Sequence, residues 1–145
     1  MILTLRVECV FGLHLENQCI RVIEIDEQMS LYDLHDAIQD AVGFDRDHPF
    51  AFFVANSASP FARRRWLTDA EGWDDQENYF RNTRLSDVYP LNRKHLYYLF
   101  DFGDDWTFEI RRGRRANPPE DRVRYPRVVS RTGPNPQQYP NIDGW

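Results

Sequence analysis

Apolar and polar residues alternate along the first two regular segments of the chain. Between residues 2 and 11 the odd positions from 3 onward are leucine, valine, cysteine or phenylalanine, whereas positions 4, 6 and 8 are polar. This period of two predicts a half-buried β-strand. Turn-forming residues follow at 12–18, and the β-branched segment CIRVIEI at 19–25 predicts a second strand. The N-terminal region is therefore expected to form two paired strands.

A helical repeat of apolar residues follows these strands. It begins after Ser30, an N-cap residue that forms a weak capping box with Asp33. Gly43 stands where a glycine that ends a helix is expected. The pattern predicts a helix over residues 30–43, with its apolar side toward the core.

The segment LYYLFDFGDDWTFEI predicts a β-hairpin within residues 95–112. A loop formed by residues 103–105 pairs Phe102 with Trp106 and places every ring of the segment on one face. We expect this register because the buried face decides how strands pair. Asp105 is expected in the left-handed backbone conformation that such loops need and that aspartate tolerates.

The middle of the chain has one clear element and one irregular region. Residues 50–54 (FAFFV) predict a third strand. Residues 56–82 predict an irregular excursion, because the periodic pattern dissolves there. Nothing marks a domain boundary, so we expect one domain over residues 1–145.

The C-terminal part of the chain is rich in proline. Because proline breaks helices and central strands, residues 117–145 predict an extended segment across the surface. One further strand is expected over residues 125–131. Tyr139 and Trp145 are expected to anchor the segment to the body of the protein.

The order of these elements predicts an α+β fold. We expect a mixed β-sheet packed by helices, in a β-grasp-like order with a central helix at 30–43 and a β-hairpin at 95–112. A β-grasp is often an interaction module, but a fold does not fix a function.

Composition narrows the classes of function. The formal net charge of −5 argues against generic nucleic-acid binding through a basic surface. No apolar run reaches the length of a membrane helix. The N-terminus has neither the charged start nor the small-residue cleavage site of a signal peptide. We therefore expect a cytoplasmic protein without a membrane partner.

Two cysteines, Cys9 and Cys19, fall in the two N-terminal strands. They do not form a CxxC pair, so they predict no zinc site. We expect both thiols to be buried and reduced, as is usual for cytosolic proteins.

Arginine dominates the basic residues, since Lys94 is the only lysine. Guanidinium groups bind carboxylates and phosphates through paired hydrogen bonds, and an aromatic residue beside them can stack on bases. A solvated arginine face, balanced by acidic residues, is the alternative interpretation. The candidate binding residues are Arg63, Arg64, Arg65 and Trp66 in one run and Arg111, Arg112, Arg114 and Arg115 in another.

The letters DFG at Asp101, Phe102 and Gly103 match the magnesium-binding motif of protein kinases. The sequence lacks the glycine-rich loop, the paired lysine and the catalytic loop of a kinase, and it is too short for that fold. With Asp104 and Asp105 the motif forms an acidic tip, whose oxygens suit hard cations. Aspartates are also common in turns, where they bind nearby backbone. We expect this turn role, with no metal and no cofactor.

A second candidate group follows the predicted helix. Asp45, Asp47 and His48 have the side chains of a ligand set or of an acid–base pair. The alternative is a capped loop in which His48 contacts a neighbouring group. No ligand spacing relates the other histidines, His14, His35 and His95.

Four stretches of the chain together resemble one protein family. They are SLYDLHDAIQDAVGFDRDHPFAFFV, RLSDVYPL, LYYLFDFGDDWTFEI and YPRVVSRTGPNPQQYP. The chain is similar along most of its length to the plasmid Ri open-reading-frame-three-like proteins, also labelled TnpR-type passenger proteins of insertion elements. Many relatives carry histidine at the position of Phe108, so no role of that histidine is carried over. The residues that match the family motifs are His48, Asp101, Phe102, Gly103, Asp104 and Trp106.

The resemblance implies an α+β domain found on plasmids, in mobile elements and as stand-alone bacterial genes. It implies no established reaction, and the sequence lacks a serine-recombinase core. We therefore expect a non-catalytic bacterial interaction module with an unknown protein partner. Two alternatives stay open: a nucleic-acid-binding accessory protein that uses the arginine runs, and a metal-dependent enzyme that uses the acidic tip and His48. The substitution Asp104→Asn separates the enzyme from the module, because only an enzyme would lose activity.

Overall fold

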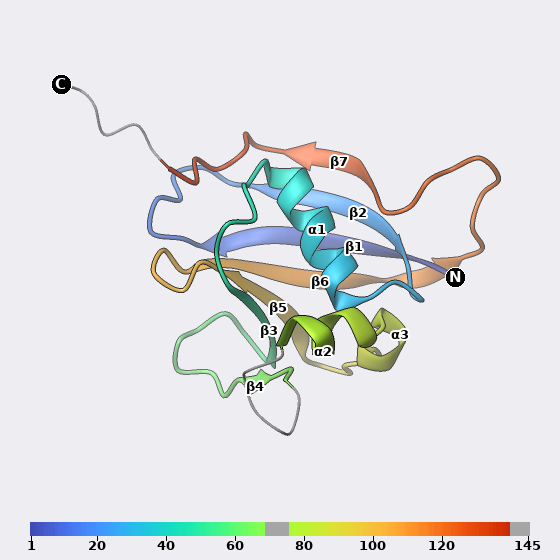
Figure 1. Cartoon of the computed structure of the whole chain (residues 1–145), viewed down its shortest axis with the longest axis horizontal. Helices are drawn as coiled ribbons and strands as arrows, with labels where there is room; N and C mark the ends of the chain where they lie inside the picture. The colour runs from blue at the N-terminus through green and yellow to red at the C-terminus, as the bar shows by residue number, and fades with distance from the viewer. Residues whose placement is uncertain (69–75, 140–145) are drawn as a thin grey trace.

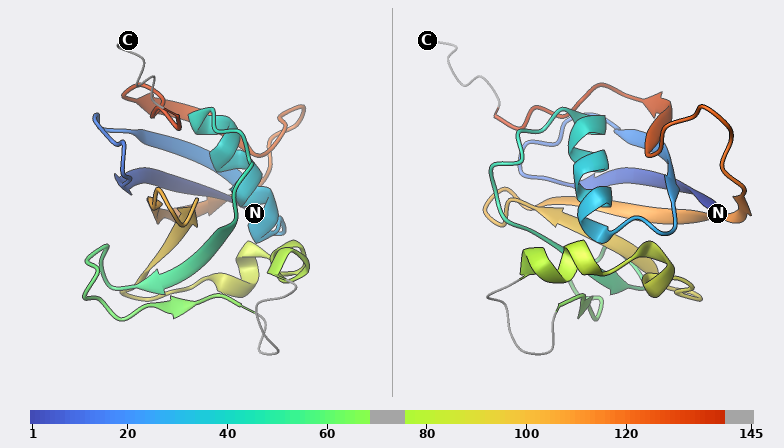
Figure 2. Two further views of the ribbon diagram at one scale, coloured as in Figure 1. Left: turned by 60° about the vertical axis from the view of Figure 1, so that its left-hand side comes forward. Right: turned by 45° about the vertical axis from the view of Figure 1, so that its right-hand side comes forward.

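The structure, a computed structural model, describes residues 1–68 and 76–139 (Figure 1). These residues form an antiparallel sheet in the order β4-β3-β5-β6-β1-β2-β7. The strands are β1 (Ile2–Phe11), β2 (Ile20–Asp26), β3 (Phe50–Ala55), β4 (Arg65–Trp66), β5 (His95–Phe100), β6 (Trp106–Asn117) and β7 (Arg127–Thr132). The helices α1 (Leu31–Val42), α2 (Gln76–Asn82) and α3 (Leu85–Val88) lie against one face of the sheet (Figure 2).

The sheet corrects one part of the predicted fold class. The expectation of an α+β fold agrees with this architecture, but the sheet is not mixed, because all pairings between its strands are antiparallel. The β-grasp-like order is not confirmed either. After β2 the chain crosses the sheet through α1 and enters β3, and β1, β6 and β5 lie between these two strands. The crossover therefore creates no parallel neighbours.

The predicted caps define α1. The Ser30 hydroxyl accepts a hydrogen bond from the Asp33 backbone at 3.1 Å, and the Asp33 carboxylate accepts one from the Ser30 backbone at 2.9 Å. Gly43 adopts the left-handed conformation with φ +73° and ends the helix. The helix expected over residues 30–43 is thus confirmed, with its two end residues acting as caps.

A buried arginine fixes the C-terminal end of α1. Arg21 is only 1% exposed, and its guanidinium donates to the Ala41 carbonyl at 3.0 Å, the Thr132 carbonyl at 3.1 Å and the Asn135 side chain at 2.8 Å. Arg131 also donates to the Ala41 carbonyl, at 2.6 Å. Positive charge at this end of a helix is favourable because the helix dipole is negative there. These bonds tie α1 to β7 and to the segment that follows it.

The hairpin of β5 and β6 has the predicted face but not the predicted register. Phe100, not Phe102, lies opposite Trp106. Asp101 and Asp105 both have positive φ, so the strand stops at Phe100 and the loop is longer than expected. Phe102 is 52% exposed at the tip. The prediction was wrong by two residues because a shift of two leaves each side chain on the same face as before.

Rings fill the space between the sheet and α1. Trp106 is fully buried, 5.1 Å from the Phe44 ring, and a Cβ atom at Gly12 would lie only 2.3 Å from its indole. The family residue Trp106 is therefore part of the core. Cys9 in β1 and Cys19 just before β2 are buried free thiols, and burial raises the pKa of Cys9 to about 12.

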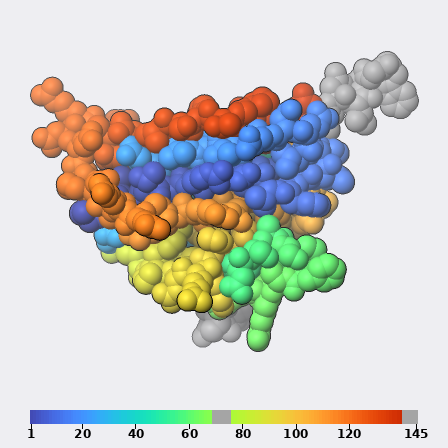
Figure 3. Space-filling view, turned by 180° about the vertical axis from the view of Figure 1, so that it is seen from behind, coloured from blue at the N-terminus to red at the C-terminus, as the bar shows by residue number. Residues whose placement is uncertain are grey.

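The opposite face of the sheet is open along much of its length. Figure 3 shows β7, β2, β1 and β6 side by side on this face. At the other end, Phe53 and Tyr97 stack with ring centroids 5.0 Å apart, and Trp66 packs on Phe53. The second face thus has a small aromatic cluster of its own.

The segment after β7 runs along the linker between α1 and β3. Gln138 accepts from the Asp45 backbone at 2.8 Å and donates to Asp47 at 3.0 Å. The Tyr139 hydroxyl also donates to Asp47. Trp145, the second expected anchor, lies outside the described residues. In the part of the chain that the structure describes, no helix is long and apolar enough to cross a membrane.

Candidate functional site

Two adjoining hollows bring most of the predicted arginines to one surface, which we call the basic groove. Their volumes are about 620 and 560 Å³, and they share the loop residues Pro90, Leu91, Asn92 and Lys94. Tyr89 lies in the wall of the larger hollow. The basic side chains that line the groove are Arg65, Arg93, Lys94, Arg111, Arg112 and Arg114.

The charge of the basic groove is almost uncompensated. Its lining contains no aspartate or glutamate among the described residues. Of the six basic side chains only Arg111 forms an ion pair within the described chain, to Glu109 at 2.6 Å. Burial alone would raise the pKa of Glu109, but hydrogen bonds from Tyr97 and Arg111 hold it below its usual value. The Arg112 guanidinium lies 5.7 Å from the centre of the Tyr89 ring.

The remaining candidates of the arginine runs lie elsewhere. Arg63 and Arg115 are exposed and do not line the groove. The Arg64 guanidinium lies 4.3 Å over the Phe53 ring, on the open face of the sheet. Trp66 packs 5.0 Å from the same ring, so its indole covers the sheet. Only the third arginine of the first run joins the second run in space.

The acidic tip has the turn chemistry that the sequence predicts. The Asp101 carboxylate accepts backbone hydrogen bonds from Gly103 at 3.1 Å and from Asp104 at 3.3 Å. The Asp105 N–H donates to the Asp101 carbonyl at 2.7 Å. Asp101 also donates its N–H to the Pro49 carbonyl, which holds the tip against the linker. Within the described residues, no three histidine, cysteine, aspartate or glutamate side chains are placed to hold a metal ion.

His48 bridges the tip and the C-terminal segment. Its Nε2 atom lies 2.8 Å from the Tyr139 hydroxyl, 3.4 Å from Asp101 Oδ2 and 3.6 Å from Asp47 Oδ1. The hydrogen bond to Asp47 raises the pKa of Tyr139 to about 12 and lowers the pKa of Asp47. The arrangement matches the alternative in which His48 contacts neighbouring groups of a capped loop.

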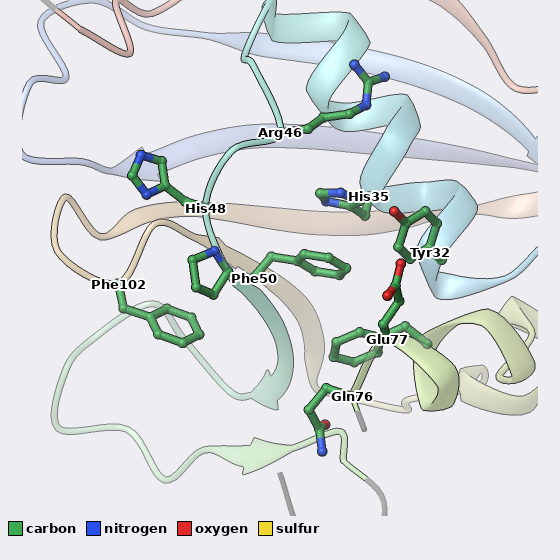
Figure 4. Close-up of a pocket in the computed structure, with 10 residues that line it drawn as sticks. Tyr32, His35, Arg46, His48, Phe50, Gln76, Glu77 and Phe102 are labelled. Atoms are coloured by element: carbon green, nitrogen blue, oxygen red, sulfur yellow. The ribbon is translucent and has the colours of Figure 1, made fainter. Parts of the chain in front are cut away.

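A second hollow, which we call the aromatic pocket, has a volume of about 440 Å³. Figure 4 shows His48 and Phe102 at one end, Tyr32 and Glu77 at the other, and Phe50 between them. The walls come from α1, the linker, β3, α2 and the hairpin tip. The lining residues are Tyr32, His35, Arg46, His48, Pro49, Phe50, Gln76, Glu77, Phe80 and Phe102.

His35 is the buried polar side chain of this pocket. It is 3% exposed, its ring stacks on Phe50 at a centroid distance of 3.7 Å, and its Nδ1 atom forms a short hydrogen bond with the Tyr98 hydroxyl. Burial lowers the pKa of His35 to about 4, with smaller effects from charges that include Asp36 and Arg46. The imidazole is therefore neutral at physiological pH.

The charges around the aromatic pocket are paired within the chain. Arg46 donates to Asp36 at 2.9 Å and also binds Asp40. Glu77 accepts from Arg81 at 3.0 Å. In contrast to the basic groove, this pocket presents no uncompensated charge from these side chains.

One feature of the sequence did point to the aromatic pocket: a histidine on the apolar side of the predicted helix. Spacing rules for metal ligands do not consider it. His35 follows Leu31 by four positions and Leu34 by one, so it falls on the apolar side of the helix. A polar residue on a buried face needs a partner. The partner, Tyr98, is distant in sequence and belongs to the hairpin.

The family assignment drawn from the sequence is confirmed. A family model described as plasmid pRiA4b ORF-3-like protein matches residues 4–139. The uncharacterized protein y4hQ of Sinorhizobium fredii is 29% identical over 98 residues, which cover 68% of this chain and 47% of that protein. The chain thus spans about half the length of this curated relative.

The fold also has a counterpart among solved structures. The crystal structure of MM3350 from Methanosarcina mazei, a protein of unknown function, matches with a TM-score of 0.69 and 24% sequence identity. The match covers 92% of this chain and 70% of that chain. It shows a shared fold.

Proposed function

This chain belongs to the family of plasmid pRiA4b ORF-3-like proteins, and we propose that it is a non-catalytic bacterial interaction module. Its basic groove holds an acidic segment of a partner protein. The observation that carries the proposal is the row of six basic side chains, of which only Arg111 has an ion pair within the described chain. On a chain with a net charge of −5, such a surface is a local exception.

Uncompensated arginines favour binding of an external anion. Like charges that line one hollow repel each other, and a bound carboxylate or phosphate removes that repulsion. The guanidinium of arginine matches a carboxylate through two parallel hydrogen bonds. Arg65 and Arg114 are exposed and free of ion pairs within the described residues, so they are available to a partner.

Two features favour an acidic protein segment over nucleic acid. Single-stranded nucleic acid is usually held by exposed aromatic rings on which its bases stack. In the basic groove the only aromatic lining residues among those described are Tyr89 and His95, and the Tyr89 hydroxyl is buried. Trp66, the aromatic residue beside the first arginine run, packs on Phe53 instead. Leu91 and Pro90 supply apolar contacts that suit a peptide.

The enzyme alternative has less support. In the acidic tip the Asp101 carboxylate already accepts hydrogen bonds from backbone N–H groups. His48 is held by Tyr139 and nearby carboxylates. We accordingly propose a cytoplasmic binding role, in line with the mobile-element setting that the family resemblance implies, and no catalytic step.

Matched charge reversals test the groove. A fluorescent polyglutamate peptide is titrated with the wild type, with the groove variant Arg65→Glu/Arg114→Glu and with the control Arg63→Glu/Arg115→Glu. All four arginines are exposed, and both variants change the net charge equally. We expect the groove variant to lose about tenfold or more in affinity, or about 1.4 kcal/mol, and the control to change little.

The same titration decides against the proposal in two cases. Equal losses in the two variants would show that only net charge matters. Tighter binding of an oligothymidylate than of the peptide, lost in the groove variant, would assign the groove to nucleic acid instead.

A further inference from the structure

The aromatic pocket contains a chain of hydrogen bonds with a fixed direction. The backbone N–H of Arg46 donates to Gln39 Oε1 at 3.0 Å, and this bond fixes the orientation of the Gln39 side-chain amide. Gln39 Nε2 therefore faces the Tyr98 hydroxyl and donates to it at 3.1 Å. The hydroxyl hydrogen of Tyr98 is then directed to the other neighbour of its oxygen, His35 Nδ1.

This chain assigns the tautomer of His35. A neutral imidazole carries one hydrogen, and because Nδ1 accepts, that hydrogen is on Nε2. Within the described residues the His35 Nε2 atom forms no hydrogen bond. The side chain is 3% exposed and lines the aromatic pocket, so the N–H is a nearly buried donor without an acceptor in the described chain. This N–H can donate only to water or to a molecule bound in the pocket.

The walls beside this donor suit a flat ring. Phe50 and Phe80 stack with centroids 5.1 Å apart, and Tyr32 approaches Phe50 edge-on at 5.9 Å. At the open end stands Phe102, whose side chain is half exposed although phenylalanine is usually buried. Figure 4 shows Phe102 at the same end of the hollow as His48, and the Phe50 ring in the middle, beside His35.

The charges select against an ionic ligand. Arg46 is neutralised by Asp36 and Asp40, and Glu77 by Arg81. An anion or a cation in the pocket would have to displace one of these partners. A neutral molecule leaves them in place.

We propose that the aromatic pocket binds an uncharged, planar heteroaromatic molecule, whose ring nitrogen or carbonyl oxygen accepts a hydrogen bond from His35 Nε2. The volume of about 440 Å³ lies within the usual range for small-molecule sites and accommodates a compound of one or two fused rings. The site is separate from the basic groove and does not depend on the function proposed for it.

Two ligands of equal size test the donor. Benzimidazole is neutral above its own pKa and has a ring nitrogen that accepts, whereas indole has a ring N–H and no such acceptor. Binding at pH 7.5 is followed by NMR of the ¹⁵N-labelled protein, which also reports the His35 Nε2 signal. We expect benzimidazole to bind about tenfold more tightly than indole and to shift that signal.

Two variants test the place of binding. Phe102→Ala removes an exposed ring at the mouth of the pocket, and Phe61→Ala removes a ring that is 96% exposed and does not line the pocket. We expect a loss of at least about fivefold in benzimidazole affinity for the first variant and no change for the second. Equal affinities of benzimidazole and indole, no binding of either at millimolar concentration, or equal behaviour of the two variants would overturn the proposal.

Discussion

The aromatic pocket and the basic groove differ in how the chain balances their charges. In the pocket Arg46 has two acidic partners and Glu77 has Arg81. In the groove there are six basic side chains, and among the described residues only Arg111 forms an ion pair. The pocket also belongs to the core, since Phe80 is 1% exposed, whereas Arg112 and Arg114 are exposed.

The difference indicates that the two hollows suit different partners. In the aromatic pocket the charges are paired, so a ligand would be recognised through hydrophobic contact and through the N–H of His35. Unpaired arginines on an exposed surface attract an anion from a distance and depend on ionic strength. The two hollows should therefore respond differently to the same substitution, salt concentration or ligand.

The largest change is expected in the free energy of unfolding, between a substitution in the core and one on the surface. Phe80→Ala removes a buried ring that contacts Phe50 and Phe52, and it should lower the free energy of unfolding by about 3–5 kcal/mol. Arg114→Ala should change it by less than about 0.5 kcal/mol, because the side chain is exposed. Urea unfolding of both variants checks this. Similar losses in the two would contradict the placement of the pocket in the core.

The next effect is a pH dependence that arises in the pocket. The pKa of His35 is about 4 in the folded protein and 6.5 in the unfolded chain. Between these values the unfolded state binds more protons, so stability is complete above pH 6.5 and falls as the pH decreases toward 4. The loss attributable to His35 is roughly 3 kcal/mol.

The variant His35→Gln isolates this contribution from the titration of carboxylates. It should flatten the curve of unfolding free energy between pH 6.5 and 4, whatever its stability at neutral pH. Parallel curves for the wild type and the variant would show that His35 titrates normally.

Ionic strength should affect binding to the two hollows differently. Polyglutamate bound in the basic groove should weaken by about tenfold between low and high ionic strength, since exposed charges are screened. Benzimidazole bound in the aromatic pocket should be unaffected, because no net charge is involved. Anisotropy and NMR titrations at several sodium chloride concentrations measure both. A salt-dependent affinity for benzimidazole would mean that the charges of the pocket are not paired in solution.

The smallest change in affinity is expected when the aromatic pocket is given an unpaired cation, like those of the basic groove. Asp36→Asn/Asp40→Asn removes both partners of Arg46 and leaves a free cation at the pocket. The preference for a carboxylated ring over benzimidazole should then increase by roughly threefold, since exposed ion pairs contribute less than about 1 kcal/mol. Competition NMR with the two ligands measures the ratio. An unchanged ratio would show that Arg46 does not face the ligand.

Local patterns predicted the elements better than their assembly. Ser30 and Gly43 located α1 because caps act within one helical turn. The hairpin was placed on the right face but two residues out of register, since alternation repeats every two residues. The long loop became visible only with Asp101 at positive φ and its carboxylate bound to Gly103.

The candidate site was predictable only in part. The arginine runs pointed to the basic groove, but adjacent side chains of an extended segment point to opposite faces. Arg64, just before β4, is therefore separated from Arg65 within it. The aromatic pocket combines four separate segments of the chain and was missed. The antiparallel sheet was also missed, because local patterns do not determine which strands α1 connects across.

The measurement that tests the central claim most directly is a pull-down from native lysate, read by mass spectrometry, before and after nuclease treatment. It compares the tagged wild type with Arg65→Glu/Arg114→Glu and Arg63→Glu/Arg115→Glu. We predict a protein partner that survives nuclease, is captured by the wild type and the Arg63→Glu/Arg115→Glu control, and is lost from the groove variant. A partner that all three proteins retain, or one that nuclease removes, would contradict an acidic protein segment in the basic groove.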